Sequence, residues 1–396
     1  MKKIAALVLA LCLSLTAFAA LADGIAKEDL KLGLITLHSE QSTYDKNFID
    51  SFKEACANKG LTEDQYAIVS DIPEGDECRQ QAEEFADEGY NMVFADSFGH
   101  EDYMIEAAQK YPEVQFCHAT GTKAHTEKLD NFHNAFASIY EGRYLAGVVA
   151  GMKLNEMKEA GKLNGEVPMI GYVGAFPYAE VKSGYTSFYL GAKSVCPDVQ
   201  MKVVFTSSWY DEIAERNSAL SLIDAKCDLI SQHADSMGAP TACQEKGVPN
   251  VSYNGSTVTA CPDTFLVASR INWAPYFEYL IDQLIAGEAI DTDWTGTIAT
   301  GSVEITEINE KAAAAGTADA VAKAKAGLED GSIKVFDTAA FTVKGAALEN
   351  YMADVDSDPA FTPDTEVVSD GYFHESELRS APYFDVDIDG IEILNN

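Results

Sequence analysis

Short apolar runs alternate with amphipathic stretches from residue 32 onward. Runs such as 32–37 and 91–95 are apolar at nearly every position, which is typical of parallel strands buried on both faces. Between them, stretches such as 47–59 gather apolar residues on one helical face and end beside a glycine. This pattern predicts a first series of strands at 32–37, 66–69, 91–95, 114–117 and 131–137, with helices at 47–59, 77–88 and 103–110.

A second series follows a long helix that we predict at 140–157. Its strands are expected at 169–173, 199–206, 228–232, 250–253 and 264–269, with helices at 180–194, 210–225 and 239–246. Two successive series of similar size predict an α/β fold with two doubly wound parallel-sheet lobes. Further on, the pattern predicts a helix at 275–286, a strand at 301–305, an alanine-rich helix at 312–327 and a strand at 333–336.

The connections between the two series predict a hinge. No stretch rich in Ser, Gly or Pro separates them, so the lobes are not joined by a flexible linker. The elements after residue 269 are most simply placed if the chain crosses between the lobes more than once, as in a clamshell. We expect lobe one to hold residues 23–138 and about 270–298, and lobe two 139–269 and about 299–345. The acidic, irregular residues 346–396 are expected to form a strap over one lobe.

The first residues predict export. Lys2 and Lys3 precede an apolar run at 4–15, and Ala20 to Ala22 provide the small-x-small pattern that a signal peptidase reads. The run is too short for a membrane anchor, and no later segment is long and apolar enough to span a bilayer. We therefore expect a signal peptide over residues 1–22, cleaved near Ala22. The mature protein would lie in the periplasm or on the extracellular face of the cell membrane.

The composition narrows the class of ligand. The formal net charge is −35, which disfavours nucleic acids, anionic membranes and phosphate-bearing ligands, so neutral or cationic ligands fit better. The common nucleotide-binding, hydrolase and zinc-protease motifs are absent from the sequence, and His118, His125 and His133 lack ligand spacing. We expect no catalytic activity, cofactor or metal. The seven cysteines of the mature chain are scattered, which favours mostly buried free thiols and leaves a disulfide open.

The candidate binding residues lie in loops after the predicted strands, because ligands of open parallel sheets bind beyond the carboxyl ends of the strands. These loops combine aromatic rings with carboxylates and neutral polar groups, a mixture that suits a flat heterocycle. The alternative is structural: aromatic rings can cover apolar seams, Asp can cap a helix, and Asn254 can form a turn. The candidates are His38, Tyr44, Asp45, Phe48, Asp96, Phe98, Phe176, Trp209, Asp235, Asn254 and Trp273.

Several longer motifs resemble one known family. They are YEGRYLAGVVAG at 140–151, GYVGAFP at 171–177, GAKS at 191–194, SWYD at 208–211, LID at 222–224, QHADS at 232–236 and NWAPY at 272–276. Together, over residues 32–305, they resemble the basic membrane protein (PnrA-like) family of ABC-transporter solute-binding proteins. The resemblance implies a periplasmic-binding-protein-like fold of type I, a purine nucleoside or base as ligand, and an ABC permease as partner.

The resemblance also implies roles for individual residues. Phe176 matches the position whose ring stacks on the ligand base, and residues 44–48 match a segment that supplies lobe-one contacts. Asn254 stands where nucleoside-binding members tend to carry an Asp that holds the ribose, and the Lys expected near Asn272 is missing. A free nucleobase or another heterocycle is therefore an alternative to a nucleoside.

The working hypothesis is a monomeric solute-binding protein whose two lobes close on a small heterocycle. Phe176 and a lobe-one ring, Tyr44 or Phe98, would stack on the ligand, and Asp96, Asp235 and Asn254 would bind its polar edge. A receptor that senses the same ligand would use the same pocket. A hydrolase that works through paired carboxylates is the third possibility that the sequence leaves open.

Overall fold

The computed structural model describes residues 24–395, so the predicted signal peptide lies outside the described residues. The chain forms two compact units. Unit 1 contains residues 24–39, 48–136 and 273–294, and unit 2 contains residues 40–47, 137–272 and 295–395. Each unit is built from separate stretches of the chain and holds one large, mainly parallel sheet, which confirms the predicted α/β fold. No helix within residues 24–395 has both the length and the apolar character needed to cross a bilayer.

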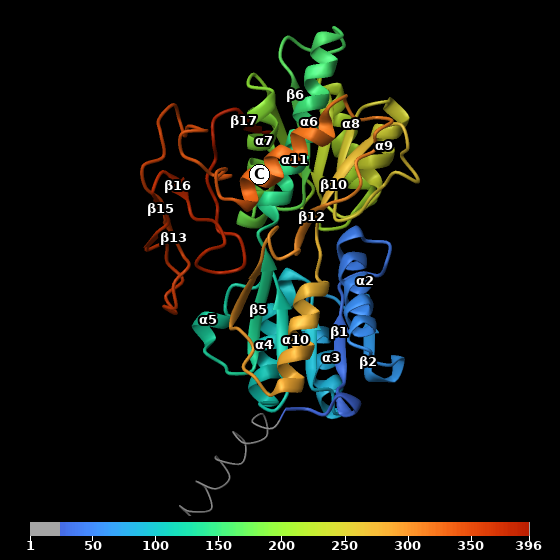
Figure 1. The fold of residues 1–396 in the computed structure, drawn as a ribbon, viewed down its shortest axis with the longest axis vertical. Coiled ribbons are helices and arrows are strands. Elements are labelled where there is room, and N and C mark those ends of the chain that lie inside the picture. Colours follow the sequence, from blue (N-terminus) through green and yellow to red (C-terminus); the bar gives the residue numbers. More distant parts are fainter. Residues whose placement is uncertain (1–23, 396) are drawn as a thin grey trace, which may run out of the picture. The chain divides into compact units, whose positions relative to one another are not determined.

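The sheet of unit 1 has the strand order β11-β5-β4-β3-β1-β2 (Figure 1). Its central strands pair in parallel and are buried along their whole length, as their continuous apolar runs predict. The strands are β1 (Leu32–Ile35), β2 (Tyr66–Val69), β3 (Met92–Ala95), β4 (Gln115–Ala119), β5 (Phe132–Ala137) and β11 (Asp293–Gly296). The main helices are α2 (Thr43–Asn58), α3 (Asp76–Asp87), α4 (Glu101–Lys110) and α10 (Ala274–Ala286).

Two apolar layers cover this sheet. Helices α3 and α4 pack Phe85 and Met104 against Val93 in one buried cluster. The other layer is aromatic, and its rings come from α2, β3 and α10. Phe52 meets Phe277 edge-on at a centroid distance of 5.0 Å, and Phe94 meets the same ring at 5.0 Å. Helices on both faces of the sheet are what its fully buried strands require.

The sheet of unit 2 has the order β12-β10-β9-β8-β6-β7-β17. In both units the first five strands are therefore arranged second-first-third-fourth-fifth, the order of a doubly wound sheet. The strands are β6 (Met169–Gly174), β7 (Gln200–Phe205), β8 (Leu229–His233), β9 (Asn250–Tyr253), β10 (Phe265–Ile271), β12 (Val303–Ile305) and β17 (Ile391–Ile393). The helices are α6 (Ile139–Glu159), α7 (Ala179–Val195), α8 (Glu212–Asp224), α9 (Gly238–Lys246) and α11 (Thr317–Glu329).

Helices also cover both faces of this second sheet. Helix α6 packs on α7, α11 and β10, whereas α8 packs on α9 and β6 (Figure 1). Helices α6 and α7 approach so closely that side chains are excluded at their crossing. A Cβ at Gly147 would lie 2.0 Å from the carbonyl oxygen of Phe188, and one at Gly191 would lie 2.0 Å from that of Tyr144. Both positions therefore require glycine.

The C-terminal part departs most from the sequence-based prediction. Residues 333 and 334 lie in no regular element and 335 and 336 in a turn, so the strand predicted there is wrong. Val335 and Phe336 are nevertheless buried, and the ring of Phe336 stacks on Phe384 with centroids 4.3 Å apart. Helix α11 starts at Thr317, five residues later than predicted, and β11 was not predicted at all.

The strap, defined as residues 346–396, packs on unit 2. It is largely irregular, but in addition to β17 it holds four two-residue strands at Met352–Ala353, Thr365–Glu366, Val368–Ser369 and Tyr372–Phe373. Its last strand, β17, pairs in parallel with the edge strand β7. Lys182 on α7 forms ion pairs with Asp385 at 2.7 Å and Asp387 at 3.2 Å. The pairing of β17 covers an edge strand that would otherwise expose its backbone groups.

Candidate functional site

The loops that leave the carboxyl edge of the unit 2 sheet are held side by side. Backbone hydrogen bonds continue past the strand ends, from Ala175 N–H to the His233 carbonyl at 3.1 Å and from Ser207 N–H to the Ala175 carbonyl at 2.8 Å. A third joins Asp235 N–H to the Trp209 carbonyl at 3.0 Å. The loops after β6, β7 and β8 therefore form one continuous surface at the sheet edge where ligands of this architecture bind.

Three rings form an aromatic shelf on this surface: Phe176, Tyr178 and Trp209. Phe176 stacks on Tyr178 with centroids 5.0 Å apart and planes 10° apart, and it meets Trp209 nearly edge-on at 5.0 Å. Phe176 and Trp209 are half-buried, whereas Tyr178 is 42% exposed. Sequence reasoning nominated Phe176 and Trp209 but not Tyr178. The shelf offers flat apolar area with defined ring directions, which suits stacking of another planar group.

Asp235 brings a buried carboxyl group to the same edge, with an exposed fraction of 5%. Burial raises the pKa of Asp235 well above its usual range, and the nearby charge of Asp45 raises it further. Thr43 fixes the loop, because its N–H donates to the Asp235 carbonyl at 3.1 Å. Segment 40–47, which holds the predicted residues Tyr44 and Asp45, thus belongs to unit 2 together with Asp235.

His233, at the end of β8, forms a hydrogen bond with a carboxylate. Its Nε2 lies 3.3 Å from Oε1 of Glu180 on α7, and its ring lies 4.7 Å from the ring of Tyr253. Burial lowers the pKa of His233 to about 4, and the charge of Arg143 adds to this effect. The imidazole is therefore neutral at neutral pH, and its contact with Glu180 is a hydrogen bond rather than an ion pair.

Arg143 on α6 is buried beside these groups with an exposed fraction of 1%. Its Nη1 donates to the Gln232 carbonyl at 2.9 Å, and its guanidinium carbon lies 3.4 Å from the centre of the Tyr253 ring. Sequence reasoning missed Arg143, Glu180, His233 and Tyr253 as site residues. His233 could have been found, because it directly follows a predicted strand. Arg143 lies within a helix, where no local pattern distinguishes it from a surface arginine.

Asn254 occupies the turn after β9 and has a left-handed backbone with φ 61°. Its N–H donates to the Ser269 carbonyl at 2.8 Å. Its side-chain amide nitrogen is buried and has no hydrogen-bond partner within residues 24–395. The backbone of Asn254 thus forms the turn, as the structural alternative predicted. Its side-chain amide is a donor that a ligand could use.

Unit 1 holds the remaining predicted site residues, which are His38, Phe48, Asp96, Phe98 and Trp273. Asp96 is fully buried at the end of β3, and its Oδ1 accepts the N–H of Leu37 at 3.1 Å. This bond ties the loop after β1, with His38, to the loop after β3. Phe98 is 38% exposed and starts the short 3-10 helix Phe98–His100. The carboxyl edge of this sheet thus also carries a ring and a carboxylate.

Phe48 and Trp273 are packed in the interior of unit 1. Their rings stack on each other with centroids 4.4 Å apart, and their exposed fractions are 0% and 1%. Trp273 also meets the rings of Phe94 and Phe136 edge-on at about 6 Å. These contacts give both rings a packing role, and their contact with a ligand stays a prediction.

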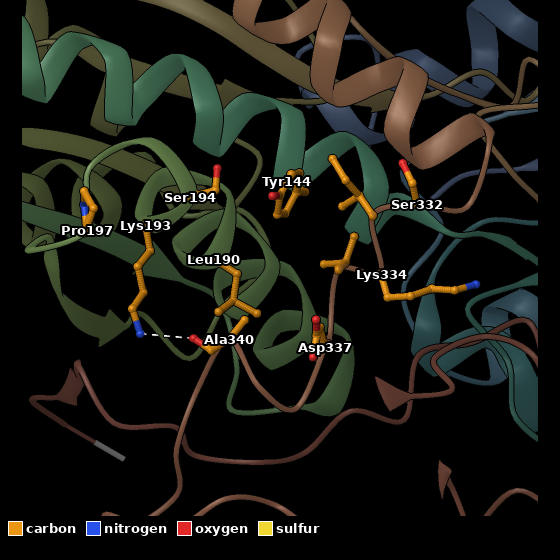
Figure 2. A pocket seen from close by; sticks show the side chains of 11 residues that line it. Tyr144, Leu190, Lys193, Ser194, Pro197, Ser332, Lys334, Asp337 and Ala340 are labelled. Atoms are coloured by element: carbon orange, nitrogen blue, oxygen red, sulfur yellow. Dashed lines mark hydrogen bonds between the residues drawn. The ribbon is translucent and has the colours of Figure 1, made fainter. Parts of the chain in front are cut away.

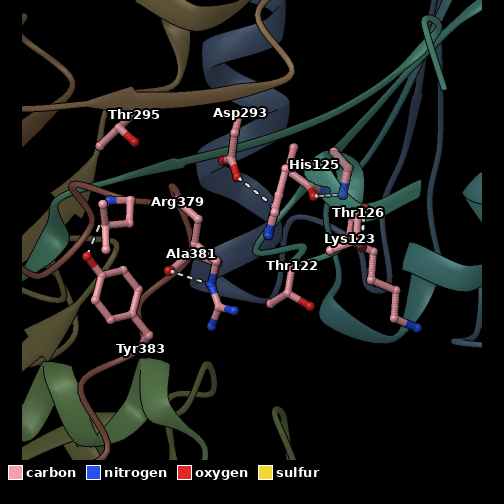
Figure 3. Close-up of polar contacts among 12 residues, drawn as sticks. Thr122, Lys123, His125, Thr126, Asp293, Thr295, Arg379, Ala381 and Tyr383 are labelled. Carbon is pink, nitrogen blue, oxygen red and sulfur yellow. Dashed lines mark hydrogen bonds and ion pairs between the residues drawn. The ribbon is translucent and has the colours of Figure 1, made fainter. Parts of the chain in front are cut away.

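Three histidines of unit 1, His118, His125 and His133, make contacts within that unit. Burial lowers the pKa values of His118 and His133 to about 4, and both rings bond to backbone or amide oxygens. His125 lies 3.7 Å from Asp293 (Figure 3). In the part of the chain that the structure describes, no three His, Cys, Asp or Glu side chains are grouped so that they could hold a metal ion.

A separate cavity of about 370 Å³ lies in unit 2 near the end of α7 that is distant from the aromatic shelf (Figure 2). Tyr144 on α6 and Leu190 on α7 form one wall, and residues 332–340 form the other. Lys193 crosses its rim and donates to the Ala340 carbonyl at 3.1 Å. The cavity lies between helices α6 and α7 on one side and residues 332–340 on the other. None of the predicted site residues lines it.

Comparison with known proteins identifies relatives of the chain. The model of the family described as ABC transporter substrate-binding protein PnrA-like matches residues 34–332. A purine-binding protein of Brucella abortus is 33% identical over 274 residues, which cover 68% of this chain and 71% of that protein. A putative ABC transporter glucose-binding protein of Haloferax volcanii is 33% identical over 54% of this chain and 51% of its own length.

Solved structures share the fold. A solute-binding protein of an ABC transporter system from Aeropyrum pernix matches with a TM-score of 0.64 and 13% identity, over 78% of this chain and 93% of its own. A second, from Conexibacter woesei, matches with a TM-score of 0.62 and 18% identity, over 77% of this chain and 98% of its own. At such identities the likeness shows the fold alone, and the strap lies beyond the part that the family model covers.

Proposed function

The chain belongs to the PnrA-like family of ABC transporter substrate-binding proteins, and we propose that its solute is a purine nucleobase or nucleoside. Members of this family bind solutes for an importer and do not convert them. The protein would bind its solute outside the cytoplasm, after removal of residues 1–22, and deliver it to an ABC permease. Closure of the two lobes on the solute, predicted from the sequence, is part of this proposal.

The aromatic shelf of Phe176, Tyr178 and Trp209 is the observation that carries this proposal. A purine added to the stack that Tyr178 and Phe176 already form would gain about 1–3 kcal/mol, the usual value for a base stacked on an aromatic ring. Further support comes from the name of the Brucella abortus relative, a purine-binding protein. The shelf provides flat apolar area for offset stacking of a planar ring.

The polar groups beside the shelf would fix the orientation of the base. His233 and Asp235 lie at or just beyond the end of β8, and Asn254 follows β9. Glu180 on α7 forms the hydrogen bond with His233. Each polar edge that was buried without a partner would cost about 1–3 kcal/mol, so these groups provide selectivity. The family resemblance implies a carboxylate for the ribose of a nucleoside at the position where this chain has Asn254. A free base is therefore the preferred ligand within this proposal.

The test is direct binding to ligand-free mature protein. Isothermal titration would compare purine bases, their nucleosides and glucose, the sugar named for the Haloferax volcanii relative. Phe176→Ala should weaken purine binding by about 5- to 150-fold, the equivalent of the lost stacking. Phe361→Ala, which removes a ring that is 49% exposed in the strap, is the matched control and should bind normally. Binding of glucose without any purine, or equal purine affinity in Phe176→Ala, would refute the proposal.

A further inference from the structure

The guanidinium of Arg143 has a hydrogen-bond partner on one side and none among the described residues on the other. Nη1 is committed to the Gln232 carbonyl, and the plane of the group lies against the Tyr253 ring. Nε and Nη2, in contrast, are buried and have no hydrogen-bond partner among the described residues. A buried charged donor without a partner is costly, so a structure that holds one needs a group to satisfy it.

The side without a partner, formed by Nε and Nη2, is the edge of a guanidinium that can bind two neighbouring acceptor atoms. Nε–H and Nη2–H point in parallel from one side of the planar guanidinium, which matches a pair of acceptor atoms in a single plane. Because Nη1 is bonded and the ring of Tyr253 covers the plane, this fork keeps one direction. A lysine at this position could not provide it, since an ammonium group has no fixed planar pair of donors.

A small residue of helix α7 lies against this fork. The position that a Cβ would take at Gly184 on α7 lies 3.6 Å from Nε of Arg143 and 2.9 Å from Nδ1 of His233. Nδ1 of His233 and the hydroxyl of Tyr253 are also buried and have no partner within residues 24–395. Nε of Arg143 and Nδ1 of His233 thus lie close to the same position on α7, and the described residues leave the hydrogen-bonding capacity of both atoms unused.

The charges nearby decide which acceptor pair fits. A carboxylate ligand would suit the fork but would meet the carboxylates of Asp45 and Glu180, whose charges act on Asp235 beside Arg143. A neutral ligand with two acceptors avoids that repulsion. Among purines, a 6-oxopurine offers O6 and N7 side by side as acceptors, whereas adenine offers N7 beside an amino group that donates.

We propose that the Nε–Nη2 fork of Arg143 binds O6 and N7 of a 6-oxopurine, so that the protein prefers hypoxanthine or guanine over adenine. This inference rests on the proposed purine-binding function. The N1–H group of the same base is a donor, and the carboxylates at this sheet edge supply acceptors for it. Adenine would place its amino group against Nη2–H, donor against donor, and should bind at least about tenfold more weakly.

The first experiment leaves the protein unchanged and varies the ligand. Titration of the wild-type protein with hypoxanthine, adenine and 7-deazahypoxanthine should give the tightest binding for hypoxanthine. Loss of N7 in the deaza compound should weaken binding about tenfold. If adenine binds equally well or better, or the deaza compound binds as tightly as hypoxanthine, the assignment of Arg143 is wrong while purine binding stands. If no purine binds at all, the proposed function itself fails.

The second experiment changes the fork. Arg143→Gln replaces it by an amide, which pairs with adenine through N6 and N7, so preference should shift from hypoxanthine toward adenine. Arg143→Lys keeps the charge without the fork and should lose the preference. Arg216→Gln is the control, because Arg216 is a partly exposed arginine on α8 that pairs with Glu245 at 2.6 Å. An unchanged ratio of hypoxanthine to adenine affinity in folded Arg143 variants would overturn the proposal. If both variants fail to fold, the ligand series decides.

Discussion

Glu375 should make the stability of unit 2 depend on pH. This strap residue is 2% exposed, its Oε1 accepts the N–H of Tyr383 at 3.0 Å, and its backbone carbonyl accepts the hydroxyl of Tyr140 at 3.3 Å. Burial raises the pKa of Glu375 from 4.5 to about 8, although the charge of Arg379 opposes the shift. The folded strap therefore holds this carboxyl in its neutral form at neutral pH.

The direction of the effect follows from proton binding. Between the unfolded pKa near 4.5 and the folded pKa of about 8, the folded state of Glu375 keeps a proton that the unfolded state releases. The contribution of Glu375 to the free energy of unfolding is therefore fully present below about pH 4.5, and it decreases as the pH rises from there to about 8. At 1.36 kcal/mol per unit, the loss between about pH 5.5 and about pH 8 is about 3 kcal/mol.

Urea unfolding at those two pH values would measure the effect. Glu375→Gln keeps the shape and removes the titration, so its unfolding free energy should fall by about 3 kcal/mol less than that of the wild type between the two pH values. The subtraction is needed because burial also raises the pKa values of Glu141 and Glu215 to about 7. Glu349→Gln, an exposed change in the same strap, should behave like the wild type. Equal pH dependence in Glu375→Gln and wild type would refute the reasoning.

Four further predictions follow from packing and local structure. Phe384→Ala should destabilise unit 2 by about 3–5 kcal/mol because the ring is fully buried, whereas the exposed Phe361→Ala should cost less than about 0.5 kcal/mol in the same urea assay. Asp211→Ala removes a cap that accepts two N–H groups of α8 and should cost about 1 kcal/mol, whereas Asp224→Ala at the opposite end should cost nothing measurable. Gly191→Ala should prevent or strongly weaken folding, seen as loss of the cooperative thermal transition. A thiol reagent should modify few groups in the native mature protein and seven after denaturation without reductant, because its cysteines are buried and form no disulfide in the described chain; fewer than seven would contradict this.

The fold could largely be predicted because buried parallel strands give unbroken apolar runs. The predictions for 66–69 and 250–253 match β2 and β9 residue for residue. The C-terminal extension could not be predicted in this way. Val335 and Phe336 give the same apolar signal as a strand. Both are nevertheless buried outside the sheets, and the ring of Phe336 packs against those of Phe373 and Phe384. Pairing of β17 with β7 joins segments almost 200 residues apart, which no local pattern can reveal.

The candidate site was only partly predictable for a related reason. Rings and carboxylates in loops after strands are visible in a sequence, and Phe176, Trp209 and Asp235 do lie on one surface. The same rule also selected Phe48 and Trp273, whose rings stack on each other; a ring near a strand end can pack against other rings as readily as against a ligand. Only the packing of the whole unit distinguishes the two cases.

The motif at 140–151 shows how one stretch of sequence can serve both fold and ligand. Its glycines are packing residues: Gly147 lets α6 approach Phe188 of α7, and the Gly191 of a second motif returns the contact against Tyr144. These glycines therefore identify the fold of unit 2 and carry no information about the solute. Arg143 is different, since helix packing does not require a buried guanidinium with two nitrogens that lack a hydrogen-bond partner within residues 24–395. If Arg143 binds the base, the part of this motif that varies with ligand class among relatives should be the arginine, while the glycines stay fixed.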